Sequence, residues 1–209
     1  MKAGKPENAP SLPKRRWIAG AGAALLLATT GCRPAKPAFA SIDITGAGYA
    51  RKVDEVDASG TPRRLADYGG RVVLVFFGFA QCPDVCPTAL ARQAQVMQLL
   101  ASDADRVQVI FISVDPERDS DDILRAYTAG FDPRFTGWRF DLATTARLAR
   151  EFKVFFSKVP LKDSALEYTI DHTALTFVFD VRGQIRLAVR HEQTPESVAS
   201  DLKQLLDER

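Results

Sequence analysis

One uninterrupted apolar run, Val-Val-Leu-Val-Phe-Phe at residues 72–77, constrains the fold of this chain more than any other segment. The run mixes β-branched and aromatic residues and has no polar face, which is typical of a strand buried on both sides in a parallel sheet. After a short loop, apolar residues recur at helical spacing: Leu90, Ala94, Met97 and Ala101. We therefore expect a strand over 71–79 and a helix that opens at 86–88, with Pro87 at its first position.

The elements that follow alternate in the same way. They are a strand over 107–114, helices over 123–129 and 144–152, a hairpin of 174–179 and 184–189, and a closing helix over 195–206. Three acids near residue 123 are interpreted as charges that favour a helix N-terminus: Asp119, Asp121 and Asp122. This order predicts an α/β, thioredoxin-like fold, with a central mixed sheet flanked by helices and a β-hairpin near the C-terminus.

Composition narrows the class of protein. The 209 residues are 46% hydrophobic and 26% charged, which suits one globular domain and excludes a disordered, collagen-like or polytopic membrane protein. The formal net charge of +2 is unevenly distributed, because residues 1–31 carry a net charge of +4 and the rest of the chain a net charge of −2. We therefore expect no nucleic-acid partner.

The N-terminal segment has the pattern of an export signal. Basic residues end at Arg16, and the apolar stretch 17–30 is too short to span a bilayer comfortably. Small residues then precede Cys32, so we expect an export or lipoprotein signal over 1–31 with lipid attached at Cys32. A cleaved soluble signal, or an uncleaved anchor with Cys32 as a spare thiol, remain alternatives. Residues 32–41, rich in Pro and Ala, are the expected tether, and 42–209 the expected folded domain.

Two cysteines and a histidine are the candidate reactive groups. Cys82 and Cys86 lie where the predicted strand meets the predicted helix, and the helix dipole favours their thiolates. A structural disulfide is the alternative. His172 precedes a strand whose entry loop faces this junction in a thioredoxin-like fold. Two thiolates and one imidazole suit copper, Cu(I) and also Cu(II), whereas structural zinc usually takes four ligands. His191 is interpreted as a solvated residue.

The chain resembles the Sco/SenC family of copper chaperones. Three blocks carry the resemblance, Cys-Pro-Asp-Val-Cys-Pro at 82–87, Ser-Val-Asp-Pro-Glu-Arg-Asp at 113–119 and Asp-His-Thr at 171–173, within a match over about 42–208. The resemblance implies that Cys82, Cys86 and His172 are copper ligands. It also implies a bacterial protein tethered to the membrane on the periplasmic side, which delivers copper to the binuclear copper site of cytochrome c oxidase.

The resemblance also sets the expected partners and the competing functions. The partners are the copper-bearing subunit of the oxidase, a copper donor chaperone and a thioredoxin-like reductase. A metallochaperone is favoured over an enzyme, and a thiol–disulfide oxidoreductase that reduces the recipient's cysteines is the main alternative. The three-residue spacer between the cysteines weakens a general redox role, and a copper or redox sensor is a further alternative. A peroxidase is disfavoured because Phe79 stands where that chemistry usually has Thr.

Three acids adjoin these blocks and are candidate supports of the site: Asp84, Asp115 and Asp171. Asp84 lies between the thiols, where it would adjust their pKa, contact the recipient or simply form the turn. For Asp115 and Arg118 a structural ion pair is the favoured interpretation.

Overall fold

The strand formed by the apolar run lies in the middle of a six-stranded sheet with the order β1-β10-β9-β4-β5-β6 in the computed structural model. In this strand, β4 (Val72–Gly78), every residue is buried. The second apolar run forms β5 (Val107–Ser113), which pairs with β4 in parallel, and β9 (Thr176–Phe179) pairs with β4 antiparallel. The sheet is therefore mixed, as predicted, and the loop that carries Cys82 follows the end of its central strand, β4.

The outer strands complete the sheet. Antiparallel pairing joins β9 to β10 (Ile185–Val189) and β10 to β1 (Ile42–Asp43), so the predicted C-terminal hairpin is confirmed. Its turn uses Gly183 at a φ of +72°, a conformation that glycine adopts without strain. At the other edge, β6 (Thr136–Trp138) pairs in parallel with β5. The pattern did not predict β6, because three residues are too few to show a periodicity.

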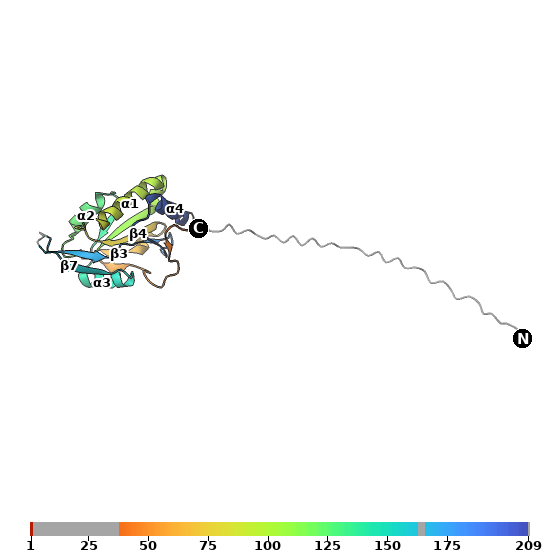
Figure 1. The fold of residues 1–209 in the computed structure, drawn as a ribbon, viewed down its shortest axis with the longest axis horizontal. Coiled ribbons are helices and arrows are strands. Elements are labelled where there is room, and N and C mark those ends of the chain that lie inside the picture. Colours follow the sequence, from red (N-terminus) through yellow and green to blue (C-terminus); the bar gives the residue numbers. More distant parts are fainter. Residues whose placement is uncertain (2–37, 163–165, 209) are drawn as a thin grey trace. The chain divides into compact units, whose positions relative to one another are not determined.

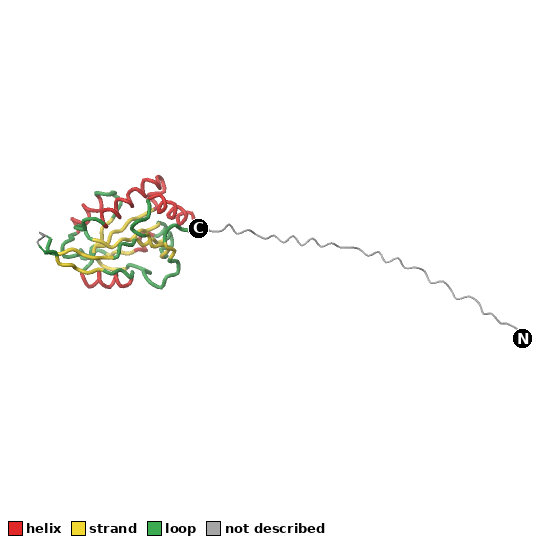
Figure 2. The backbone as a smooth tube through the Cα atoms, viewed as in Figure 1, coloured by secondary structure: helices red, strands yellow, loops and turns green. Residues whose placement is uncertain are grey.

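Helices cover both faces of the sheet. Among the residues that the structure describes, the α-helices are α1 (Val85–Leu100), α2 (Asp121–Ala129), α3 (Leu142–Glu151) and α4 (Pro195–Asp207). Two 3-10 helices, η1 (Leu65–Tyr68) and η2 (Ala101–Arg106), precede β4 and β5. Figure 1 shows α1, α2 and α4 on one side of the strands and α3 on the other, and Figure 2 shows the same layers in red and yellow. The fold is thus the predicted α/β thioredoxin-like arrangement.

The start and the buried face of α1 differ from the prediction. The helix begins at Val85, so Pro87 is its third residue and not its first. Proline is tolerated there because the N–H groups of the first helical turn have no intrahelical acceptor. Ala101 was expected on the core face, but it is exposed and ends the helix with a φ of +52°. Leu100 is buried in its place.

The acids at the start of α2 divide into two groups. Ser120 caps the helix by accepting a hydrogen bond from the Ile123 amide, and Asp121 and Asp122 lie in the first turn, as expected of charges that favour a helix N-terminus. Asp119 was grouped with them incorrectly. Its side chain is buried and points toward the sheet, where it binds groups at the end of β4 and β5.

A second hairpin, absent from the prediction, lies outside the main sheet. It consists of β7 (Phe156–Pro160) and β8 (Tyr168–His172), which pair with each other in a two-stranded sheet. Another two-stranded sheet joins β2 (Asp54–Val56) to β3 (Pro62–Arg64). The strands of both sheets are short and only partly buried, so their sequences do not alternate cleanly between apolar and polar residues.

The structure describes residues 1, 38–162 and 166–208, and Ala38–Arg209 form one compact unit. The expected export signal at 1–31 and lipid attachment at Cys32 fall, apart from Met1, outside the described residues. Across the part that is described, no helix has the length and apolar character needed to cross a membrane.

Candidate metal centre

The two cysteines lie where the central strand passes into the first helix. Cys82 is half-buried in the loop after β4, and its amide donates to the Phe79 carbonyl over 3.2 Å. Cys86 is fully buried as the second residue of α1, and its amide donates to Cys82 Sγ over 3.4 Å. Both are free thiols. Strand, loop and helix therefore present two sulfur atoms on the same side of one turn.

Gly78, the last residue of β4, makes room for the buried thiol. A Cβ placed there would lie 2.8 Å from Cys86 Sγ and 2.8 Å from Cε2 of the Phe111 ring, both closer than real Cβ contacts. This glycine was not among the predicted site residues. Its position inside a β-branched and aromatic run was the available signal, because glycine within a strand often marks a close approach.

His172 reaches the thiols from the separate hairpin. It is the last residue of β8, and its Nε2 lies 3.3 Å from Cys86 Sγ. On the other side of the ring, Nδ1 lies 3.2 Å from the Thr173 carbonyl oxygen, so an Nδ1–H donates there and Nε2 faces the thiols. The rings of Phe76 and Phe79 meet the imidazole edge-on, with centroids 5.8 and 5.9 Å away.

The two thiols have opposite acidities. The hydrogen bond from Cys86 lowers the pKa of Cys82 to about 3, against the effect of burial, and His172 and the amides of Asp84 and Cys86 contribute in the same direction. The same contact raises the pKa of Cys86, and burial raises it further. The expectation that the helix dipole favours both thiolates is therefore wrong for Cys86. In the pair, Cys82 is the thiolate and Cys86 holds the shared proton.

The structure brings the three predicted ligand residues together. One ligand atom each from Cys82, Cys86 and His172 lies within 4.8 Å of the other two. Among the described residues, these three form a group that could hold a metal ion. Two sulfur atoms and one imidazole nitrogen form a soft donor set, which fits Cu(I) and tolerates Cu(II). Zinc fits less well, since this group offers three protein ligands and not the four of a structural zinc site.

A buried carboxylate, that of Asp119, accepts a hydrogen bond from the start of the loop that carries Cys82. Asp119 accepts a hydrogen bond of 2.6 Å from Ser113 Oγ and bonds of 3.2 and 3.3 Å from the Ala80 amide. Burial raises the pKa of Asp119 to about 6, although both donors oppose the shift. Asp119 thus ties the end of β5 to the first residues of the cysteine loop, a role that the sequence analysis missed.

The three predicted supporting acids occupy different environments. Asp84 is exposed at the N-cap of α1 without a side-chain capping bond, and its amide helps to lower the pKa of Cys82. Asp171 is exposed on β8 beside His172. Asp115 is fully buried and forms the expected ion pair with Arg118. Of the three, only Asp115 has a charged side-chain partner among the contacts found in the described residues.

A shallow cavity of about 220 Å³ opens beside the cluster. Its walls come from the cysteine loop and from β8, and its lining includes Cys82, Asp84, Asp171 and His172. Both walls carry an exposed acid, so an entering ligand meets negative charge at the rim.

The second histidine, His191, was expected to be solvated. It is only partly exposed, and its Nδ1 is buried without a hydrogen-bond partner among the described residues.

Comparisons with known proteins agree with this geometry. A sequence model of the SCO1/SenC family matches residues 48–207. Among solved structures, copper-bound ScoI of Bradyrhizobium japonicum is 39% identical, with a TM-score of 0.65 over 74% of this chain and 97% of that one. A mitochondrial SCO2 homolog of Mus musculus is 33% identical over 150 residues, which are 71% of this chain and 58% of the relative. The chain thus spans a little over half the length of that relative.

A more distant structure shows the same fold. It shares 20% identity and a TM-score of 0.61 over 81% of this chain and 99% of its own. That protein, BsSco, is described as a member of the Sco family of cytochrome c oxidase assembly proteins with a disulfide switch. At this identity the likeness extends to the fold alone.

Proposed function

The chain belongs to the SCO1/SenC family, and we propose that it carries one copper ion on Cys82, Cys86 and His172 and delivers that ion to the binuclear copper site of cytochrome c oxidase. The observation that carries the proposal is the convergence of two thiols from the core and one imidazole from a separate hairpin within 4.8 Å. Copper is the cargo in this account and not a permanent part of the protein.

The acidities of the three groups suit binding and release. Cys82 offers a thiolate at neutral pH, and Cys86 gives up its proton when a metal ion takes the place of that proton between the sulfurs. The imidazole of His172 offers Nε2, the ring nitrogen that faces the thiols. Release then proceeds by ligand exchange, in which a thiolate of the recipient approaches through the cavity beside Cys82 and replaces the protein's ligands in turn. No electron is transferred in this sequence, so the copper keeps its oxidation state.

A transfer experiment tests the proposal. The copper-loaded protein is mixed with the reduced, metal-free copper-bearing domain of an oxidase subunit, and copper on each protein is measured after separation. We expect copper to move to the recipient from the parent. A Cys86→Ser variant, which lacks one thiol, should neither hold nor deliver it. Retention of all copper by the parent in the presence of excess recipient would contradict the proposal.

Thiol–disulfide exchange is the second candidate, and the unequal thiols favour it. A half-exposed thiolate at Cys82 beside a buried, protonated Cys86 is the arrangement of an attacking thiol and a resolving thiol. Cys82 would attack a disulfide of the recipient, Cys86 would then release the reduced recipient, and the protein would end with its own disulfide. Oxidation of Cys82 and Cys86 in step with recipient reduction, unaffected by His172→Ala, would favour this role over copper transfer.

The location and the other partners belong to the same proposal. A lipid on Cys32 would tether the domain to the periplasmic side of the membrane, and Cys32→Ser should then release the protein into the soluble fraction. Unchanged membrane retention would indicate an uncleaved anchor instead. A copper donor chaperone would load the site, and a thioredoxin-like reductase would keep its thiols reduced.

A further inference from the structure

The hairpin that carries His172 presents one row of side chains to the rest of the domain. Because side chains alternate along a strand, Tyr168, Ile170 and His172 share a face of β8, whereas Thr169 and Asp171 lie on the other. Ile170 is 4% exposed, so this face packs against the domain. The position of the imidazole therefore depends on the contacts that hold Tyr168, at the other end of this row of side chains.

Arg118 contacts the Tyr168 end of β8 through both the ring and the backbone of Tyr168. Its guanidinium carbon lies 3.7 Å from the centroid of the Tyr168 ring, and its Nη1 donates to the Tyr168 carbonyl over 2.8 Å. The same side chain forms the ion pair with Asp115, whose other carboxylate oxygen accepts a 2.9 Å hydrogen bond from the Tyr168 hydroxyl. The loop that follows β5 thus contacts Tyr168 at its ring, its hydroxyl and its backbone, and Lys158 Nζ of β7 also lies 4.4 Å from the centroid of the same ring.

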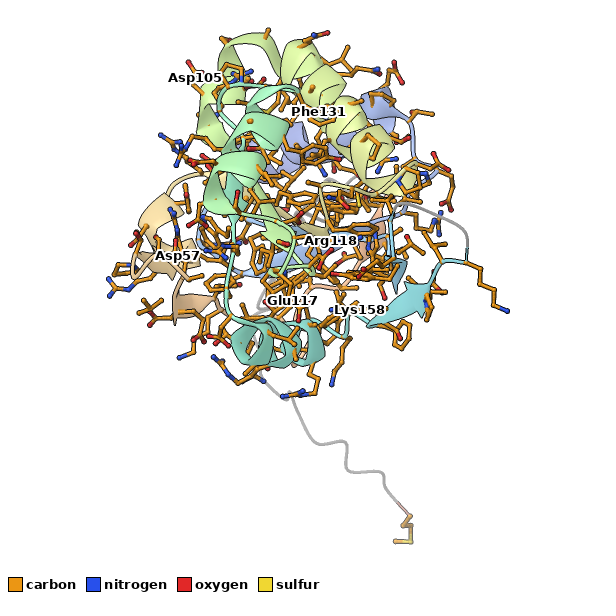
Figure 3. The ribbon with its side chains drawn as sticks, turned by 90° about the vertical axis from the view of Figure 1, so that its left-hand side faces the viewer. Asp57, Asp105, Glu117, Arg118, Phe131 and Lys158 are labelled. Carbon is orange, nitrogen blue, oxygen red and sulfur yellow. The ribbon has the colours of Figure 1, made fainter. Side chains whose placement is uncertain are left out.

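This arrangement is largely withdrawn from solvent. The Asp115 side chain is fully buried, and that of Arg118 is 18% exposed. Ion pairs in such settings have a defined geometry, because a guanidinium offers its donors in a fixed plane. A neighbouring pair between Glu117 and Lys158 also joins the two segments, but both side chains are about half exposed and such pairs contribute little. Figure 3 shows Arg118, Glu117 and Lys158 on the same side of the domain.

Arg118 also approaches the wall of the metal centre. Its guanidinium carbon lies 6.0 Å from the centroid of the Phe79 ring, and that ring meets the imidazole of His172 edge-on. Arg118 therefore contacts the strand that carries the imidazole and lies near one of the two rings that pack against the imidazole. Its Nη2 is buried and has no hydrogen-bond partner among the described residues, so the structure keeps this guanidinium inside despite one unsatisfied donor.

We propose that Arg118 is a positioning residue, which clamps β8 through Tyr168 and thereby sets the imidazole of His172 against the two thiols. The inference rests on the proposed copper-binding function and assigns to that site a residue that touches none of its ligand atoms. Removing the clamp should loosen the imidazole while the thiol pair, which is held by β4 and α1, stays in place.

The test is a cycle of variants in the reduced, full-length chain. Arg118→Met keeps the length of the side chain and removes its charge and donors, and Arg118→Lys restores the charge alone. Arg125→Met is the matched control, because Arg125 forms an ion pair of the same i,i+3 spacing with Asp122 on the exposed side of α2. Copper affinity is measured by competition with a chelator in the parent and in His172→Ala.

We expect Arg118→Met to weaken copper binding about tenfold, in the range seen when a group that orients a metal ligand is removed. In the His172→Ala background the same substitution should have no further effect, since there is no imidazole to position. Arg118→Lys should recover part of the loss and Arg125→Met should match the parent. Equal losses from Arg118→Met in both backgrounds, or no loss in either, would overturn the proposal.

A measurement without metal keeps this test separate from the proposed function. In the metal-free protein, the Phe76 and Phe79 rings should shift the NMR signals of the His172 ring protons, and Arg118→Met should move these signals toward the values of a free histidine. An unchanged His172 spectrum in a folded Arg118→Met variant would overturn the clamp. If instead the parent fails to bind copper while this shift is seen, the proposed function fails and the clamp stands.

Discussion

The thiol loop and the histidine hairpin supply the same site but are built in different ways. The loop joins β4, whose residues are all buried in the six-stranded sheet, to α1. Within the described part of the chain, the two strands of the hairpin pair with each other and with no third strand, and two-stranded sheets of this kind are marginal without further contacts. The sulfur ligands are therefore fixed by the core of the fold, whereas the imidazole is fixed by contacts made at its own hairpin.

This difference suits a carrier of a metal ion. In the proposed function, two thiols that stay in place would keep the ion bound while the third ligand is exchanged, and an imidazole on a separate hairpin would be the ligand that moves at the lowest cost. The cavity between β8 and the cysteine loop lies at the boundary of the two regions, which is where an incoming ligand would arrive.

Hydrogen exchange should show the largest contrast between the regions. Amides of β4 and β5 exchange only when the domain unfolds, whereas those of β7 and β8 exchange by local opening of the hairpin. In the metal-free protein we expect the hairpin amides to exchange at least about a hundredfold faster. Copper should slow the hairpin and leave β4 unchanged. Equal protection of the two regions without metal would contradict the comparison.

Lowering the pH should strengthen the thiol region through Asp119. The carboxyl has a pKa of about 6 in the folded protein and an ordinary value of 3.8, so between these values the folded state holds a proton that the unfolded chain has released. This contribution is complete below the lower value and is lost as the pH rises through the higher one, by roughly 2 to 3 kcal/mol.

Urea unfolding of the reduced, metal-free protein between about pH 4 and about pH 7 measures this contribution against Asp119→Asn. The amide keeps an acceptor for Ala80 and Ser113 and does not titrate. The parent should lose stability relative to the variant as the pH rises. A difference that is constant over this range would show that Asp119 does not hold the proton.

Gly78→Ala should disturb the thiol region and spare the hairpin. The added methyl group would meet Cys86 Sγ and the Phe111 ring at 2.8 Å, and forced overpacking of this kind costs about 1 to 3 kcal/mol. The free energy of unfolding from urea titration measures this cost. Gly69→Ala is the control, because the nearest atom to its Cβ lies at 3.5 Å. A Gly78→Ala variant as stable as the parent would contradict this expectation, because it would show that β4 and its neighbours can shift to accommodate the added methyl group.

The smallest expected effect concerns the two thiols themselves. Since the pKa of Cys82 is about 3 and that of Cys86 is raised, iodoacetamide should modify Cys82 at a rate that changes less than about twofold between pH 5 and pH 8. Mass spectrometry of peptides identifies the modified residue. A rate that rises about tenfold for each pH unit would indicate an ordinary thiol at Cys82.

The sequence predicted the thiol region far better than the hairpin. The apolar runs of β4 and β5 identify buried strands without ambiguity, and the cysteines follow one of them directly. In β7 and β8 the residues are mixed and partly exposed, so no period appears, and His172 was found by its position in the chain and by resemblance.

Tertiary contacts account for the remaining differences. The sequence around Asp119 is typical of a helix N-terminus, so it does not reveal that the carboxylate is buried. The folded chain directs this side chain inward, where it accepts a hydrogen bond from the Ala80 amide. The grip of Arg118 on Tyr168 joins residues that are 50 positions apart, which no local pattern reveals. The close approach of Gly78 to Cys86 likewise depends on how α1 lies on the sheet.

The central claim is that two fixed thiols and one imidazole hold a single copper ion. Its most direct test is the copper content of the reduced protein after exposure to copper and removal of excess, beside His172→Ala. We expect one copper ion per parent chain and an affinity at least about tenfold weaker in the variant, as for loss of a group that completes a metal site. Equal copper content and affinity in the two proteins, or no copper in the parent, would contradict the account.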